Sequence, residues 1–137
     1  MTTVSSLQNI RVLLVEDNKI NQMLLKKMIE NLGCCVTTAD NGIHALEKLC
    51  GEENFDIVLT DIQMPVMGGF DLANSIRMSD NTTLATIPVL AQTGYADELD
   101  RVAAKDSGIR EILTKPFGQE DIKEALLRAL GISPSKT

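Results

Sequence analysis

The chain has 137 residues, 44% hydrophobic and 23% charged, which is the composition of one soluble globular domain. Its net charge of −6 and the lack of any basic run argue against direct binding to nucleic acid. No apolar run approaches the roughly 18 to 20 residues of a membrane span, and no secretory signal is visible, so membrane insertion and secretion are not expected. Cys34, Cys35 and Cys50 lack the spacing and histidine partners of a zinc site, and we expect reduced, packed thiols in a cytoplasmic protein.

Apolar segments alternate with amphipathic ones along the chain, which indicates five β-α units. The expected elements, in chain order, are strand 10–15, helix 18–32, strand 34–38, helix 41–50, strand 56–60, helix 68–78, strand 87–91, helix 95–107, strand 111–114 and helix 118–130. Strands of nearly continuous Val, Ile and Leu should be buried on both faces, as in a parallel sheet wrapped by helices. The sequence therefore predicts an α/β fold, a flavodoxin-like (βα)5 doubly wound parallel sheet with strand order 2-1-3-4-5. Flexible tails are expected over 1–8 and 132–137, around a domain spanning 9–131.

Acidic residues follow two of the expected strands, at the point where each strand ends. Glu16 and Asp17 follow the first strand, and Asp61 follows the third, just before a turn rich in Pro and Gly. The carboxyl ends of parallel strands meet at one edge of the sheet, so we expect these three carboxylates to lie together. Carboxylates so close repel one another unless a cation lies among them, and a hard divalent ion such as Mg²⁺ (or Mn²⁺) meets that need.

A hydroxyl and an ammonium group are expected at the same edge. Thr93 follows the fourth strand, and Lys115 follows the fifth. Once a metal ion neutralises the acids, Asp61 can act as a nucleophile toward a phosphoryl group, while Thr93 and Lys115 stabilise the transferred oxygens. Each residue has a simpler interpretation, since Asp17 could cap a helix and Lys115 could be a surface lysine, but their joint occurrence at four strand ends favours the phosphoryl chemistry.

These residues resemble the receiver domain of two-component response regulators over about 9 to 130. The motifs that carry the resemblance are Val15-Glu16-Asp17-Asn18 with Asn21-Gln22, Asp61 with Met64-Pro65 and Gly68-Gly69, Thr93-Gly94-Tyr95, and Lys115-Pro116-Phe117. The first of them is similar to the opening of receivers attached to hybrid sensor histidine kinases.

The resemblance implies a role for each matching residue. Asp61 would accept a phosphoryl group from a histidine kinase or a histidine phosphotransfer protein. Asp17 would bind magnesium directly, Glu16 through water, and Gln63 through its backbone carbonyl. The peptide bond before Pro116 would be cis, which is plausible because only an X-Pro bond adopts that form at small cost. The protein would then be a phosphoacceptor signalling domain that assists its own phosphorylation and dephosphorylation, and not an enzyme.

One departure concerns the relay of the signal. The family usually carries an aromatic residue three positions before the lysine, where this chain has Ile112. A β-branched side chain has few rotamers, so we expect little rearrangement around it on phosphorylation. A monomer is favoured, and the chain is either a stand-alone receiver or one cut from a hybrid kinase.

Further expectations concern the partner and the lifetime of the phosphorylated state. The apolar positions of helix 18–32 span roughly 240°, far wider than the approximately 100° needed to cover a core. Four residues suffice to cover the sheet, namely Leu24, Leu25, Met28 and Leu32. Ile20 and Met23 are therefore candidates for partner docking, unless the last helix covers them. Gln63 and Tyr95 flank the phosphate position and are expected to hinder attack by water.

Two other classes of protein remain as alternatives. A phosphatase of the haloacid dehalogenase type also forms an aspartyl phosphate, but its acid/base aspartate should stand two residues after the nucleophile, where Gln63 lies. A flavodoxin-like cofactor carrier needs a phosphate-binding loop after the first strand, where Glu16 and Asp17 would repel the phosphate. A phosphatase assay and the colour of the purified protein distinguish these classes.

Overall fold

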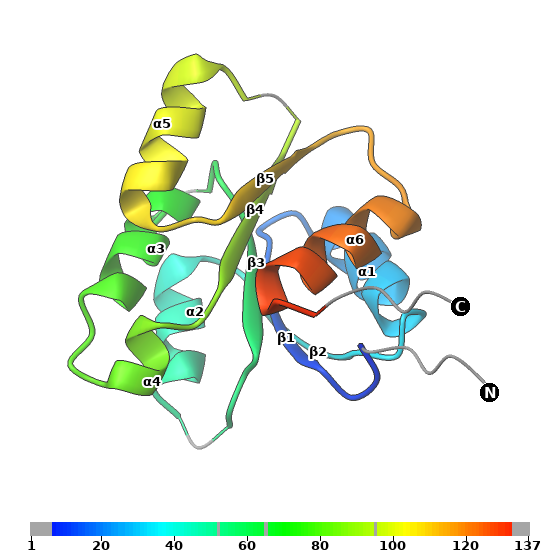
Figure 1. Cartoon of the computed structure of the whole chain (residues 1–137), viewed down its shortest axis with the longest axis horizontal. Helices are drawn as coiled ribbons and strands as arrows, with labels where there is room; N and C mark the ends of the chain where they lie inside the picture. The colour runs from blue at the N-terminus through cyan, green and yellow to red at the C-terminus, as the bar shows by residue number, and fades with distance from the viewer. Residues whose placement is uncertain (1–6, 52, 65, 95, 133–137) are drawn as a thin grey trace.

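A computed structural model describes residues 7–51, 53–64, 66–94 and 96–132. Five parallel strands form one sheet in the order β2-β1-β3-β4-β5, which confirms the predicted topology. Helices cover both faces, with α1 and α6 on one face and α2, α3 and α5 on the other (Figure 1). The strands are β1 (Arg11–Val15), β2 (Cys35–Ala39), β3 (Ile57–Asp61), β4 (Val89–Thr93) and β5 (Glu111–Thr114), and the helices are α1 (Lys19–Glu30), α2 (Gly42–Leu49), α3 (Gly69–Arg77), α4 (Thr82–Ala85), α5 (Glu98–Ser107) and α6 (Gln119–Leu130).

The sheet divides the core into two hydrophobic clusters, because successive side chains of a strand point to opposite faces. In β1, Leu14 packs under α1 and α6, whereas Leu13 and Val15 pack on the opposite face. β3 and β4 alternate in the same way, and all of these side chains are buried. This explains why the three central strands, β1, β3 and β4, are mainly apolar and lack a regular polar alternation.

Two helices differ from the sequence-based expectation. The segment before the fourth strand, for which no helix was expected, contains the short helix α4, and the backbone N–H of Leu84 donates to the side chain of Asn81 at its start. The helix expected over 95–107 begins only at Glu98 in α5, because Asp97 and Asp100 form a reciprocal capping box there. The first four residues of an α-helix need such external acceptors, so the cap decides where the helix begins.

The boundaries expected for the domain need a correction at both ends. Leu7, expected in the flexible tail, is fully buried in the cluster under α1 and α6. The main-chain N–H of Asn9 donates to Gly33 at 2.8 Å and so fixes this segment next to the end of α1. Ile132 packs against the same cluster and donates to Leu127 at 2.9 Å. The rest of the expected tails, 1–6 and 133–137, lies outside the described residues.

The cysteines also differ in part from the expectation of packed thiols. Cys34 is buried, and that burial raises the pKa of its thiol to about 11, so it is an inert apolar side chain. Cys35 and Cys50 are exposed, and all three are free. Cys35 opens the edge strand β2, where only one side of the strand is covered by a neighbour.

Candidate functional site

The three predicted carboxylates meet at the carboxyl edge of the sheet. β1 and β3 are neighbours, and their register pairs Val15 with Thr60, so the next residue on each strand is an acid. Carboxylate oxygens of Glu16, Asp17 and Asp61 all lie within 4.8 Å of one another. The expected convergence of the three acids is therefore confirmed.

The electrostatics of the site are unfavourable to three ionised acids. Burial first, and then the nearby charges of Glu16 and Asp17, raise the pKa of Asp61 from 3.8 to about 6. A hydrogen bond of 3.3 Å from the backbone N–H of Gln63 and the charge of Lys115 act in the opposite direction. An all-oxygen donor set with excess negative charge fits a hard divalent cation, which would relieve that repulsion.

Glu16 is the most deeply buried of the three acids, with 1% of its surface exposed. Its Oε2 accepts a hydrogen bond of 3.0 Å from the backbone N–H of Asn18. Its Oε1 accepts one of 2.7 Å from the side-chain amide of Gln92, a fully buried residue of β4. Sequence reasoning missed Gln92, although a glutamine that interrupts the apolar run before Thr93 was a visible signal.

A second buried glutamine, also missed, supports the loop after β1. The side-chain amide of Gln22 donates to the backbone carbonyl of Glu16 at 2.9 Å and to Asp40 at 3.1 Å. Lys19 forms an ion pair of 2.6 Å with Asp40, and this interaction holds the pKa of Asp40 below its usual range. These contacts attach the start of α1 to the end of β2 and so fix the direction of the acidic loop.

Thr93 and Lys115 come to the same edge from β4 and β5. Thr93 is the buried last residue of β4, and its carbonyl accepts a 2.9 Å hydrogen bond from the backbone N–H of Lys115. The ammonium group of Lys115 is near enough to Asp61 to lower its pKa. The Lys115–Pro116 peptide bond is cis, as the resemblance implied. Tyr95, one of the two expected lifetime residues, lies outside the described residues.

The two residues expected to dock a partner are exposed at the start of α1. Ile20 is 77% exposed and Met23 is 71% exposed, so α6 does not cover them. The expectation for Leu24 was wrong, because this residue was expected to cover the sheet but is 58% exposed. The buried residues of α1 are Gln22, Leu25 and Ile29, and at 100° per residue Leu24 lies about 100° from the nearest of them, outside that stripe.

The loop after Asp61 contains a strained residue. Val66 has a φ of +72°, in the left-handed region that a β-branched residue rarely adopts, and it is 81% exposed. We expect Val66→Asn to stabilise the protein by about 1 kcal/mol, since asparagine tolerates this conformation. Urea unfolding measures the difference. Val66→Thr keeps the β-branch and serves as the control, and an equal gain in both variants would contradict the assignment of strain.

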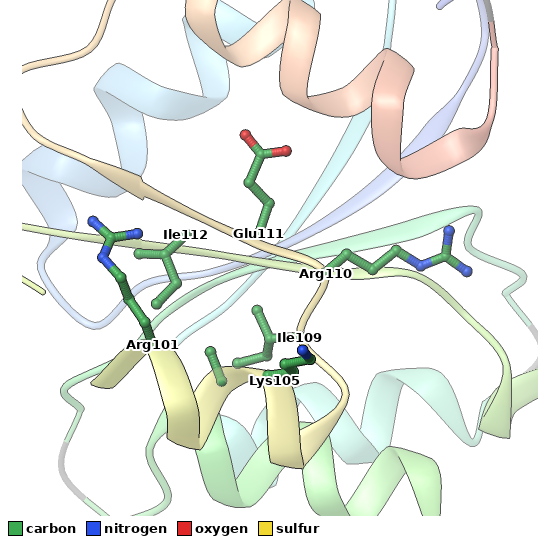
Figure 2. A pocket seen from close by; sticks show the side chains of 7 residues that line it. Arg101, Lys105, Ile109, Arg110, Glu111 and Ile112 are labelled. Atoms are coloured by element: carbon green, nitrogen blue, oxygen red, sulfur yellow. The ribbon is translucent and has the colours of Figure 1, made fainter. Parts of the chain in front are cut away.

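Ile112 belongs to the edge strand β5 and lines a groove between α5 and β5. The groove has a volume of about 480 Å³ and includes Arg101, Lys105 and Ile109. Figure 2 shows Arg101 of α5 next to Ile112, whereas the side chain of Glu111 leaves the strand on the side away from α5. That carboxylate pairs with Arg128 of α6 at 2.6 Å. Ile112 itself is half-buried against the cluster under α2, α3 and α5.

The fold and the acidic edge together define a flavodoxin-like protein with a carboxylate site suited to a divalent cation. A model of the response regulator receiver domain family matches residues 12–127. The chain therefore belongs to the response regulator receiver domains and is a phosphoacceptor-type signalling domain of two-component systems. In the described part of the chain, no helix is both long enough and apolar enough to cross a membrane.

Individual relatives agree with this assignment. The sensor histidine kinase GacS of Pseudomonas protegens is 34% identical over 90% of this chain, and the transcription factor SKN7 of Saccharomyces cerevisiae is 34% identical over 93%. The chain spans only 13% and 20% of those two proteins. Among solved structures, the receiver domain of the sensor histidine kinase PA1611 from Pseudomonas aeruginosa, with a magnesium ion in its active site cleft, is 32% identical with a TM-score of 0.80, covering 90% of this chain and 98% of that one. The chemotaxis protein CheY4 of Vibrio cholerae is 29% identical with a TM-score of 0.81, covering 89% of this chain and 99% of that one.

Proposed function

We propose that Asp61 accepts a phosphoryl group from a phosphohistidine in a magnesium-dependent reaction. The observation that carries this proposal is the meeting of three carboxylates within 4.8 Å, with Lys115 near enough to influence Asp61. The P–N bond of the donor breaks, an oxygen of Asp61 forms the new bond to phosphorus, and the released imidazole takes up a proton. Incubation with acetyl phosphate and Mg²⁺, followed by intact-mass measurement, tests the proposal.

We assign separate roles to the residues of the site. Asp17, Asp61 and the backbone carbonyl of Gln63 would hold Mg²⁺ (or Mn²⁺), with Glu16 acting through water. Such an ion neutralises the acids and binds phosphoryl oxygens. Lys115 would stabilise the charge that develops on the transferred oxygens.

Thr93 ends β4 at the same edge, where its hydroxyl would donate to a phosphoryl oxygen. A magnesium ion in the cleft of the PA1611 receiver supports the choice of metal. An acid two residues after the nucleophile, which a haloacid dehalogenase phosphatase needs, is replaced by the exposed Gln63. We therefore regard the chain as a signalling domain whose only substrate is the phosphoryl donor.

The partner of this reaction would be a histidine kinase or a histidine phosphotransfer protein, because GacS and related kinases contain a similar segment. The negative net charge argues against direct contact with nucleic acid. Exposed, free Cys35 and Cys50 suit the reducing cytoplasm, where we place the protein. We propose a monomer, and sedimentation of the metal-bound protein tests that state.

Docking of the partner is proposed on Ile20 and Met23. We expect Ile20→Gln/Met23→Gln to slow transfer from a phosphorylated histidine protein by about 10-fold or more, because exposed apolar side chains near a site are what a partner can bury. Acetyl phosphate needs no docking, so labelling by it should stay unchanged. The rate of phosphoryl transfer is followed on a gel with labelled donor.

A matched control changes the apolar pair on α5, Leu99→Gln/Val102→Thr, whose members are 77% and 50% exposed. This pair lies on a different helix from the proposed docking residues. Transfer from the histidine protein should be normal in that variant. Equal slowing in both double variants, or equal loss of both reactions in the first, would argue against docking on α1.

Gln63 and Tyr95 are proposed to set the lifetime of the phosphorylated state. Gln63 is exposed, and its backbone N–H donates to the carboxylate of Asp61 at 3.3 Å, which supports a place for this residue next to the phosphoryl position. We expect Gln63→Ala and Tyr95→Ala to hydrolyse faster than wild type, because less bulk hinders the in-line approach of water. Decay of the phosphorylated mass after removal of the donor measures the effect, and unchanged decay in both variants would show that neither side chain blocks water.

A further inference from the structure

Gln92 carries an unpaired polar atom next to the acidic site. Its Oε1 is the one buried side-chain nitrogen or oxygen without a hydrogen-bond partner in the part of the chain that the structure describes. The side chain is fully buried, and leaving such an acceptor unpaired destabilises the folded protein. A buried glutamine whose carbonyl oxygen has no partner needs an explanation, and we look for it in the hydrogen bond that its side-chain nitrogen makes.

The strand register places this amide beside Asp61. Asp61 and Gln92 are directly paired on neighbouring strands, and β3 lies between β1 and β4. By strand alternation, Glu16, Asp61 and Gln92 all point to the face of the sheet covered by α1 and α6, because Leu14, Leu59 and Leu90, two residues before each of them, pack there.

The hydrogen bond from Gln92 to Glu16 therefore crosses the middle strand next to Asp61. It joins residues on strands two places apart in the sheet, a separation of about 9.5 Å. Only two long side chains can close that distance. The position therefore requires an amide donor and the full length of glutamine.

Both oxygens of Glu16 are consequently held in place, one by Gln92 and one by the backbone of Asn18. A carboxylate fixed from two sides cannot turn to chelate a cation without losing these bonds. Ca²⁺ takes six to eight oxygens and uses bidentate carboxylates, whereas Mg²⁺ demands octahedral geometry and keeps several of its waters. A fixed Glu16 suits the second ion, because it can accept from a metal-bound water.

We propose that Gln92 is a positioning residue that holds Glu16 and makes the acidic site prefer Mg²⁺ over Ca²⁺. This inference rests on the metal site of the proposed function. The Oε1 of Gln92 is attached to the same carbon as the nitrogen that bonds Glu16, and it would be a further acceptor for a hydrated ion bound at the site.

The test compares binding of Mg²⁺ and of Ca²⁺ by metal-free wild type, Gln92→Met and Gln92→Asn, measured by amide NMR titration without any phosphoryl donor. We expect both variants to bind Mg²⁺ about 10-fold more weakly, which is typical for loss of a residue that orients a metal ligand. Ca²⁺ binding should weaken less, so the preference for Mg²⁺ narrows. Gln92→Asn keeps the amide but loses the reach, so it should behave like Gln92→Met.

Ser107→Ala is the control, because that polar side chain is also buried but bonds the backbone carbonyl of Ala104 within α5, away from the acidic site. Its preference for Mg²⁺ should equal that of wild type. The same spectra show whether each variant is folded. In wild type, the side-chain amide signals of Gln92 should shift more than those of Gln22 when Mg²⁺ is added, a result that needs no variant.

The outcomes of this experiment distinguish failure of the metal site from failure of the role proposed for Gln92. No binding of Mg²⁺ by wild type would refute the metal site and the inference with it. Normal binding by wild type, with the ratio of Mg²⁺ to Ca²⁺ affinity unchanged in both Gln92 variants or changed equally in Ser107→Ala, would refute only the role of Gln92.

Discussion

Wild-type protein incubated with acetyl phosphate and Mg²⁺ is expected to gain the mass of one phosphoryl group, and Asp61→Asn is expected to gain none. The amide of asparagine is no nucleophile toward phosphorus, and it removes one of the three carboxylates that meet at the edge of the sheet. The loss should therefore be complete and not partial. Intact-mass spectrometry under acidic, cold conditions reads the modification directly.

Three further variants separate the parts of this reaction. Asp17→Asn should lose labelling together with Mg²⁺ binding. Lys115→Ala should keep Mg²⁺ binding but be labelled about 100-fold more slowly, since a group that stabilises developing charge is typically worth that much. Asp106→Asn changes an exposed acid of α5 and should be labelled like wild type. Labelling that persists in Asp61→Asn would assign the phosphoryl group to another residue.

Asp61→Asn is also expected to stabilise the metal-free protein at about pH 8, by about 2 kcal/mol. Burial first, and then the charge of Glu16, raise the pKa of Asp61 from 3.8 to about 6 in the folded protein. A raised pKa means that folding favours the protonated form. The stability from Asp61 is thus fully present below 3.8 and is lost as the pH rises through 6. The shift would correspond to about 3 kcal/mol at most, and partial exposure of Asp61 reduces it.

Urea unfolding in the presence of a chelator measures this effect. The difference between Asp61→Asn and wild type should be near zero below the ordinary pKa of 3.8, should grow between 3.8 and 6, and should be constant above that range. Addition of Mg²⁺ at high pH should stabilise wild type and reduce the difference, because the ion relieves the repulsion. A difference that does not change with pH would mean that Asp61 is not destabilised by its surroundings.

Much of this site could be predicted because its residues follow directly from strand ends. Glu16, Asp17 and Asp61 each terminate an apolar run, and parallel topology then brings the ends of those runs to one edge. Thr93 and Lys115 reach the edge for the same reason, although the expected fourth strand began two residues too early. To place these residues at one edge of the sheet, it is enough to know that the strands are parallel and in which order they lie; their register is not needed.

The two buried glutamines could not be predicted from these rules. Gln92 bonds a residue 76 positions away, and that pairing depends on the register of three strands and on the length of two side chains. Gln22 lies among apolar residues of α1, where the apolar pattern assigns the buried stripe to Leu24, yet the buried positions include Gln22 instead. Hydrophobic periodicity records apolar burial only, so a polar side chain buried for its hydrogen bonds escapes it.

Exposure of Ile20 and Met23 has a consequence for how such a domain can acquire new partners. Neither side chain belongs to either core cluster, so a substitution there should alter the free energy of unfolding by less than about 0.5 kcal/mol. The acids that would perform the chemistry come from strand ends, outside that exposed surface. Under the proposed docking, specificity can therefore diverge after gene duplication without loss of folding or of phosphoryl transfer, and related pathways in one cell can become insulated from one another.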